Sequence, residues 1–145
     1  QRLGVRFSPL FTTTDEDRVY LGLVEDDPHA TYIAAARVLE EAGIGYVSIA
    51  EADWDNAPEL PEDFRRDLRQ TFSGRIIVAG RYTAERGERL LEAGLADLIA
   101  FGRPFIANPD LPARIAHGWP LNALNPATMY GGGTAGYTDY PVHAG

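Results

Sequence analysis

The sequence predicts an α/β fold of about four βα units, which is half of a (β/α)8 (TIM) barrel. Short runs such as RIIVAG and DLIAFG are almost continuously apolar, as in parallel strands covered on both faces. Helix signals separate these runs. A doubly wound sheet would carry GxGxxG after its first strand, whereas here glycines end the last two strands. A whole barrel takes about 250 residues, so 145 residues indicate half of one.

Four strands are predicted, at residues 3–8, 45–51, 75–80 and 97–102. The first helix is expected to open at Asp27-Pro28 and to end before Gly43, because Asp caps, Pro suits the first turn and Gly ends helices. Its inward face is expected to carry Tyr32, Ala35, Ala36 and Leu39. Four strands leave two unpaired edges, so another chain or a second copy must complete the barrel. We expect Val5, Val47, Ile77 and Ile99, or their strand neighbours, to face the interior.

Three further helices are predicted downstream. One starts at Pro61 with Phe64 and Leu68 inward, and a second is capped by Thr83 and ends before Gly94. The inward positions of that second helix are Gly87, Leu90 and Leu91. The last begins at Asn108-Pro109 with Leu111 and Ile115 on one face. Charged positions on the predicted helices are expected to be solvated, such as Glu40 and Glu41 on the first helix and Arg65 and Arg66 on the helix that starts at Pro61.

Composition excludes several classes of function. The net charge is -8, from 13 basic and 21 acidic residues, which opposes binding to nucleic acids and anionic membranes. All 13 basic residues are arginine and cysteine is missing, so the chain has no lysine for a Schiff base and no thiolate. No apolar run reaches the roughly 18 residues of a membrane span, and the start lacks the regions of a signal peptide. We expect a cytoplasmic protein without a metal site.

Two loops have the composition of a phosphate site. AGRYT (79–83) ends the third strand and FGRPF (101–105) ends the fourth, where barrels commonly bind phosphate. Gly80 and Gly102 allow close backbone approach, and Arg103 supplies a charged fork. The alternative is that both glycines make turns and Arg103 pairs with a carboxylate. Arg6, inside the apolar VRFSP, should meet a buried anion or a ligand edge; a buried salt bridge is its alternative.

The motifs GVRFSP, YVSIAEADW, GRIIVAGRYT, ADLIAFGRPFIANPDLP and YGGGTAGYTDYP occur in this order. Together they resemble old yellow enzymes, with the bacterial xenobiotic, N-ethylmaleimide and nitrate-ester reductases as the nearest members. The resemblance implies that residues 1–145 are the C-terminal half of a single FMN-binding TIM-barrel domain, with 119–145 as its tail. It also implies an NADPH- or NADH-dependent oxidoreductase that transfers hydride from reduced FMN to electron-poor alkenes such as enones and maleimides, with nitro compounds or nitrate esters as further acceptors.

The resemblance also assigns site residues. Arg6 faces the pyrimidine edge of the flavin. The FMN phosphate is assigned to Ala79, Gly80, Arg81, Gly102 and Arg103. Trp54 and Tyr130 contact the substrate, although simple packing is an alternative for Trp54. Met129 stands where the family often has phenylalanine, and Tyr137 and Tyr140 are expected to pack the tail.

No catalytic residue is expected on this chain. The family's substrate-binding His pair and proton-donating Tyr belong to the other half, and His29, His117 and His143 match neither. The implied partners are a complementary N-terminal half-barrel chain, or a second copy, and a small activated alkene. Residues 10–27 are expected to form a long loop that overhangs the pocket or is solvated. Two alternatives stay open: another phosphate-binding barrel enzyme, and a non-catalytic half-barrel that pairs with itself.

Overall fold

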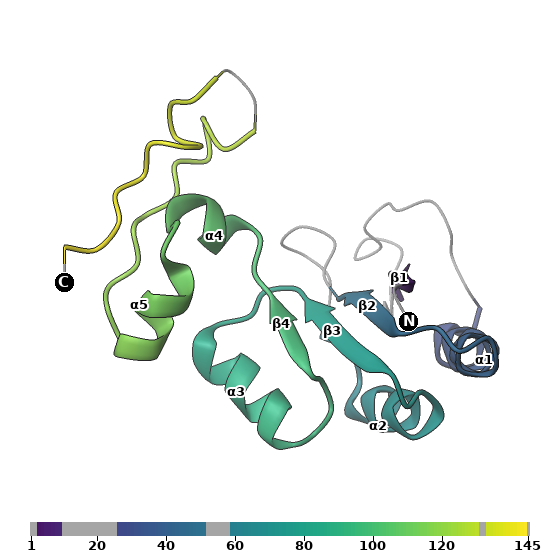
Figure 1. The fold of residues 1–145 in the computed structure, drawn as a ribbon. Helices are drawn as coiled ribbons and strands as arrows, with labels where there is room; N and C mark the ends of the chain where they lie inside the picture. The colour runs from purple at the N-terminus through teal and green to yellow at the C-terminus, as the bar shows by residue number, and fades with distance from the viewer. Residues whose placement is uncertain (1–2, 10–25, 52–58, 131–132, 145) are drawn as a thin grey trace. The chain divides into compact units, whose positions relative to one another are not determined.

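The computed structural model describes residues 3–9, 26–51, 59–130 and 133–144. These residues gather in two compact units that divide between Ala100 and Phe101, each described by itself below (Figure 1). Trp54 and almost all of the predicted loop 10–27 lie outside the described residues. Within the described part of the chain, no helix combines the length and apolar character needed to cross a membrane.

The first unit is a parallel four-stranded sheet in the order β1-β2-β3-β4, as the sequence predicts. The strands are β1 (Gly4–Phe7), β2 (Tyr46–Ala50), β3 (Arg75–Ala79) and β4 (Leu98–Ala100). The helices between them are α1 (Pro28–Glu41), α2 (Glu62–Thr71) and α3 (Ala84–Glu92). All three helices lie on one side of the sheet (Figure 1). This arrangement of right-handed βα units is that of a TIM-barrel fragment.

Helices α1 and α3 begin and end where the sequence predicts, because capping side chains and glycines stand at these positions. The Asp27 side chain accepts a hydrogen bond from the Ala30 N–H at 2.9 Å, and the Thr83 hydroxyl accepts one from the Arg86 N–H at 3.2 Å. Gly43 and Gly94 follow α1 and α3 with φ of 67° and 69°, a conformation that glycine adopts without strain. On α1, Ala36 is buried as predicted, whereas Ile33, which the prediction omits, is buried as well.

The strand register separates two faces of the sheet. Phe7, Ile49 and Val78 form one row and are buried under the helices. Val5 and Val47 share the face of this row, and Ile99 pairs with Val78. On these three strands the interior face therefore carries the strand neighbours of the named residues, which is the alternative that the expectation included. A Cβ on Gly87 of α3 would lie 3.1 Å from Ile99, so Ile99 faces a helix. Ile77 is on the opposite face, as predicted, because strand side chains alternate.

The second unit contains α4 (Arg103–Ala107), α5 (Leu111–His117) and the following segment. The fourth predicted helix exists as α5, but it begins at Leu111 after Asp110 and not at Asn108-Pro109. Helix α4 is not anticipated, because its five residues, RPFIA, have too few turns for a helical period. Two buried side chains hold the segment after α5: Asn108 accepts from the Asn122 N–H at 2.7 Å, and Arg114 donates to the Pro141 carbonyl at 3.0 Å. That residues 119–145 form a tail of one FMN-binding domain remains a prediction.

Candidate functional site

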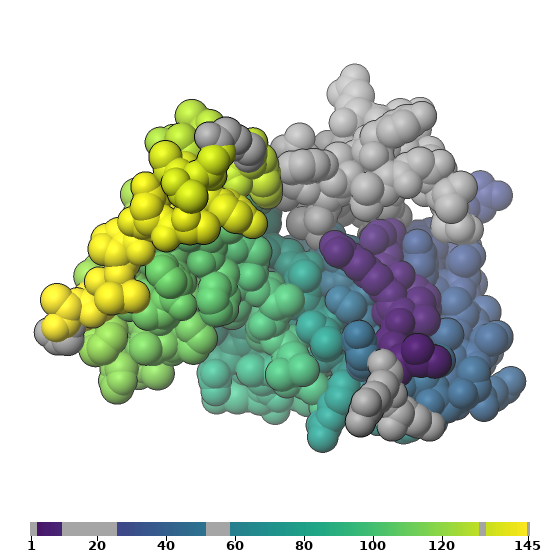
Figure 2. All heavy atoms as spheres, turned by 45° about the horizontal axis from the view of Figure 1, so that its top comes forward, coloured from purple at the N-terminus to yellow at the C-terminus, as the bar shows by residue number. Residues whose placement is uncertain are grey.

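Arg6 lies in a row of side chains on the sheet face opposite the helices. The register pairs Arg6 with Ser48, Ser48 with Ile77 and Ile77 with Leu98. Arg6 is exposed rather than buried, which corrects the expectation of a buried charge: the face that a complete barrel would enclose is open in this chain. No carboxylate among the described residues pairs with Arg6, so the salt-bridge alternative has no support there. β1 forms a surface-exposed edge of its unit (Figure 2).

The β3–α3 loop, residues 79–83, leaves the carboxyl end of the sheet. Its backbone is fixed at Ala79, whose carbonyl accepts a hydrogen bond from the Glu51 N–H at 2.8 Å, and at Arg81, whose carbonyl accepts one from Arg86 Nη1 at 3.2 Å. A Cβ on Gly80 would lie 3.3 Å from the Glu51 Cβ, so the loop passes Glu51 closely enough to favour glycine. Gly80 and Arg81 are exposed.

A cluster of polar side chains lies under this loop, centred on Glu51. The Arg65 guanidinium donates to both Glu51 oxygens at 2.7 and 2.6 Å, and the Tyr82 hydroxyl donates to Glu51 Oε1. Arg86 Nη2 donates to Oε2 at 3.3 Å. The Arg86 guanidinium also stacks on the Tyr82 ring, 4.3 Å from its centroid. We call these four residues, Glu51, Arg65, Tyr82 and Arg86, the Glu51 cluster.

Burial and the Glu51 carboxylate change the pKa of two members of the Glu51 cluster, Tyr82 and Arg65. Burial raises the pKa of the Tyr82 hydroxyl, and its hydrogen bond to Glu51 and the Glu51 charge raise it further. Burial alone would lower the pKa of Arg65, but the hydrogen bonds and charge of Glu51 outweigh it and raise that pKa. Tyr82 therefore stays neutral and Arg65 stays charged at any physiological pH.

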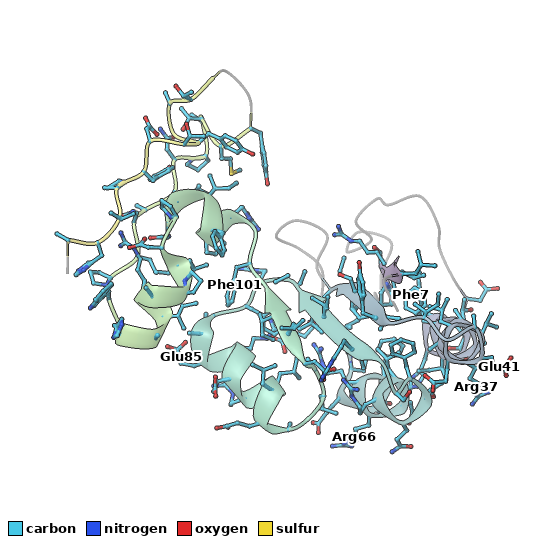
Figure 3. All side chains as sticks on the ribbon, viewed as in Figure 1. Phe7, Arg37, Glu41, Arg66, Glu85 and Phe101 are labelled. Carbon is cyan, nitrogen blue, oxygen red and sulfur yellow. The ribbon has the colours of Figure 1, made fainter. Side chains whose placement is uncertain are left out.

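This cluster is not predicted from the sequence, where Arg65 is expected on a solvated helix face. In the structure Arg65 is buried, whereas its neighbour Arg66 extends outward from α2 (Figure 3). One signal in the sequence was available. Glu51 ends an apolar strand, and a buried carboxylate requires a basic or hydroxyl partner. Glu40, expected on a solvated face, has a partner on the exposed surface: its carboxylate accepts from the Ser73 hydroxyl at 2.7 Å and the Ser73 N–H at 2.9 Å.

Gly102 and Arg103 follow Phe101, the first residue of the second unit. Gly102 is the residue before α4, and a Cβ added to it would meet no atom within 4 Å. No neighbouring atom would therefore clash with a larger residue at position 102, and a ligand has space there. Arg103 is the first residue of α4 and is half-buried.

Aromatic residues line two open hollows in the second unit. The smaller, of about 370 Å³, is lined by Met129, Tyr130, Gly133 and Tyr137. The larger, of about 530 Å³, is lined by Gly102, Phe105, Ile106, Pro109, Tyr137, Thr138 and Tyr140. Tyr130 is 64% exposed. Tyr137 lines both hollows and is 54% exposed, so it differs from the packed residue that was expected. Tyr140 does pack, because its hydroxyl accepts from the Asn125 N–H at 2.8 Å.

The three histidines have structural contacts. His29 Nε2 lies 2.8 Å from Asp67 Oδ2, which joins the start of α1 to α2. In the second unit, Trp119 stacks against both His117 and His143, with ring centroids 4.7 and 4.3 Å apart. These contacts join the end of α5 to the chain terminus.

Comparison with known proteins identifies what the chain resembles as a whole. Residues 1–122 match the model of the NADH:flavin oxidoreductase / NADH oxidase family. Morphinone reductase is 42% identical with a TM-score of 0.86, over 98% of this chain and 36% of that one; it is also known in complex with tetrahydroNAD. The old yellow enzyme of Trypanosoma cruzi is 32% identical with a TM-score of 0.83, over 98% and 35% of the chains.

A curated relative from Leishmania infantum, described as a probable flavin mononucleotide-dependent alkene reductase, is 31% identical over 141 residues. The match covers 97% of this chain and 36% of the relative. The chain thus spans about a third of the length of the proteins that it matches.

Proposed function

Because this chain belongs to the NADH:flavin oxidoreductase / NADH oxidase family, which includes the old yellow enzymes that its motifs resemble, we propose that it is part of an FMN-dependent ene-reductase. The reductant is NADPH or NADH, and the acceptors are electron-poor alkenes such as enones and maleimides. The relatives support this proposal, since one is described as an alkene reductase that uses flavin mononucleotide and another binds tetrahydroNAD. They favour a flavin enzyme over a different phosphate-binding barrel enzyme.

The residues at the carboxyl end of the sheet fit FMN. A phosphate needs backbone N–H groups that it can approach and cationic side chains, and the exposed Gly80 and Arg81 offer both. When bound, FMN would accept hydride from the nicotinamide and pass hydride to the β-carbon of the alkene. The chain's own part is to bind the cofactor and to tune its charge.

The assigned residues fall into two groups. By the family resemblance, the phosphate is assigned to Ala79, Gly80 and Arg81 of the β3–α3 loop and to Gly102 and Arg103. Arg6 faces the pyrimidine edge of the isoalloxazine. From there the guanidinium stabilises negative charge that develops on the flavin during reduction.

Two residues are assigned to the substrate pocket. Tyr130 presents an exposed ring beside Met129 in the smaller hollow, which suits contact with a flat, conjugated substrate. Trp54 is assigned by its motif alone, since it lies outside the described residues. The substrate-binding His pair and the proton-donating Tyr are expected on the remaining part of the barrel, so this chain supplies no catalytic residue.

The barrel has to be completed by units that lie outside this sequence. We propose a complementary N-terminal half-barrel, or a second copy, that pairs with the edges of β1 and β4. Both strands pair with only one neighbour among the described residues. The face that carries Arg6 would then become the barrel interior.

The observation that carries the proposal is the glycine loop after β3, which is held at its carbonyls while Gly80 and Arg81 are exposed. The test is to co-express the chain with the first units of an old yellow enzyme barrel and to isolate the complex. We expect bound flavin, visible in the absorbance spectrum, and anaerobic NADPH oxidation that depends on N-ethylmaleimide. A folded complex that takes up no FMN would overturn the proposal.

A further inference from the structure

The carboxylate of Glu51 is a buried negative charge that the proposed reaction does not use. Its side chain is 2% exposed, and four hydrogen bonds from three side chains reach its two oxygens. A buried ion is tolerated only when its lone pairs are satisfied in this way. The Glu51 cluster is therefore fully paired, and its donors are held in fixed positions.

Two members of the cluster hold the β3–α3 loop itself. Arg86 reaches from α3 to the Arg81 carbonyl at 3.2 Å while its other nitrogen contacts Glu51. Tyr82 is the next residue of the loop, and its hydroxyl is fixed by Glu51 and by Arg65 Nη1 at 3.3 Å. The backbone of Glu51 adds the bond to the Ala79 carbonyl. Residues 79, 81 and 82 are thus all tied to one carboxylate-bearing residue.

We propose that Glu51 is a positioning residue for cofactor binding: through Tyr82 and Arg86 it holds the β3–α3 loop in the conformation that receives the FMN phosphate. This inference rests on the proposed function, which assigns the phosphate to Ala79, Gly80 and Arg81. Pre-organisation is the physical basis. A loop that is already ordered loses less conformational entropy when it binds an anion than a loop that must first be fixed.

A purely structural role for the cluster makes a different prediction. If Glu51 only stabilised the fold, its loss would weaken every flavin contact to the same extent. If it positions the phosphate loop, the loss is specific to ligands that carry the phosphate. Riboflavin separates the two cases, because it has the isoalloxazine and ribityl groups of FMN but no phosphate.

The experiment measures dissociation constants of FMN and riboflavin for the assembled, flavin-free enzyme and its variants. Arg86→Gln removes the charged tie to Arg81, and Tyr82→Phe removes only the hydroxyl. Each is expected to weaken FMN binding by about 3- to 10-fold, the range for one hydrogen bond, and to change riboflavin binding less than about twofold.

Glu51→Gln, which removes the shared acceptor charge, is expected to weaken FMN binding by about 10- to 100-fold and again to change riboflavin binding less than about twofold. Glu62→Gln, which breaks the exposed Glu62–Arg66 pair on α2, is the matched control and should leave both constants unchanged.

The outcomes separate the inference from the function on which it rests. Wild-type enzyme that binds FMN no more tightly than riboflavin would overturn the phosphate assignment. A wild-type preference for FMN that persists in Arg86→Gln and Tyr82→Phe, or equal losses for both flavins, would overturn the positioning role alone. If Glu51→Gln does not fold, the FMN and riboflavin dissociation constants of Arg86→Gln and Tyr82→Phe test the positioning role.

Discussion

Arg65 and Glu51 form a two-pronged ion pair between α2 and the end of β2, with side chains only 9% and 2% exposed. Both oxygens of the carboxylate receive a guanidinium N–H, at 2.7 and 2.6 Å. The pair joins α2 to the end of β2, next to the β3–α3 loop to which the FMN phosphate is assigned. Removing one partner leaves the other charge buried and alone, which is the costly case for buried ions.

We therefore expect Arg65→Ala to lower the free energy of unfolding of the assembled protein by about 3–5 kcal/mol. Arg66→Ala is the control, because Arg66 forms an exposed pair with Glu62, and such pairs contribute less than about 1 kcal/mol. Urea denaturation followed by circular dichroism measures both. Equal effects of the two substitutions would show that the Glu51–Arg65 pair does not carry the stability assigned to it.

Asp97 makes stability depend on acid pH. Partial burial works to raise its pKa, but the Ile76 N–H, Arg75 and Arg69 outweigh burial and lower the pKa of Asp97 from 3.8 to about 2. A folded-state pKa below the unfolded value means that the contribution is complete above about pH 4 and is lost as the pH falls towards 2. At about 1.36 kcal/mol per pH unit the shift corresponds to roughly 2 kcal/mol. Asp97→Asn should unfold at lower urea concentration at pH 6, with the difference from wild type shrinking towards pH 2; a difference that stays constant would contradict this.

The ends of α1 and α3 could be predicted from the sequence because their signals are local. Asp27, Thr83 and the glycines at 43 and 94 act on the nearest turn of backbone, so neighbouring residues were enough to place these ends. The sheet faces were harder. Val5 and Val47 are as apolar as Ile77, and composition alone does not say which alternate set faces the helices; the register in the folded sheet decides it.

The site was only partly predictable, for the same physical reason. Gly80 and Arg81 could be proposed because they follow a strand within one motif. Arg65 could not, because its partner Glu51 is 14 positions earlier and a charged residue on an amphipathic helix is usually solvated. Pairings across a fold leave no periodic pattern in the sequence, so the Glu51 cluster needed the structure.

Arg103 is expected to retain FMN rather than to take part in hydride transfer. Charged hydrogen bonds contribute about 1.5–3 kcal/mol, so Arg103→Ala in the assembled enzyme should raise the FMN dissociation constant by roughly 10- to 100-fold. Turnover should largely recover when FMN is saturating. Flavin titration and steady-state rates with excess FMN test both statements. A variant that keeps wild-type affinity, or that stays inactive with excess FMN, contradicts the role.

Arg6 is expected to act on the charge of the flavin. Its exposed guanidinium lies on the open face of the sheet, where it would face the pyrimidine edge and stabilise the anionic reduced form. Arg6→Ala should slow flavin reduction by NADPH, make the flavin reduction potential more negative and weaken FMN binding. Stopped-flow reduction and potentiometry measure the first two. Arg6→Lys keeps the charge but loses the planar fork. Its rate of flavin reduction and its reduction potential should lie between those of the wild type and of Arg6→Ala. Unchanged rate and potential in Arg6→Ala would remove the assignment.

The last prediction is that this chain is inactive until the rest of the barrel joins it. The face opposite the helices carries Tyr46, Ile77 and Leu98 in neighbouring strands, and Tyr46 and Leu98 are 39% and 52% exposed. Each Å² of apolar surface left in water forfeits about 25 cal/mol of stabilisation, and the free edges of β1 and β4 invite pairing with other strands.

Expressed alone, the chain should therefore be aggregated, molten or paired with itself, and inactive towards maleimides and enones even with FMN and NADPH. Co-expression with a complementary N-terminal half should restore bound flavin and turnover, because that half brings the expected His pair and Tyr. Light scattering and NADPH oxidation assays compare the two preparations. A matched co-expression in which the complementary half lacks its His pair should restore bound flavin but not turnover. If the 145-residue chain alone is a stable monomer that reduces such alkenes at ordinary enzymatic rates, the requirement for a partner is wrong.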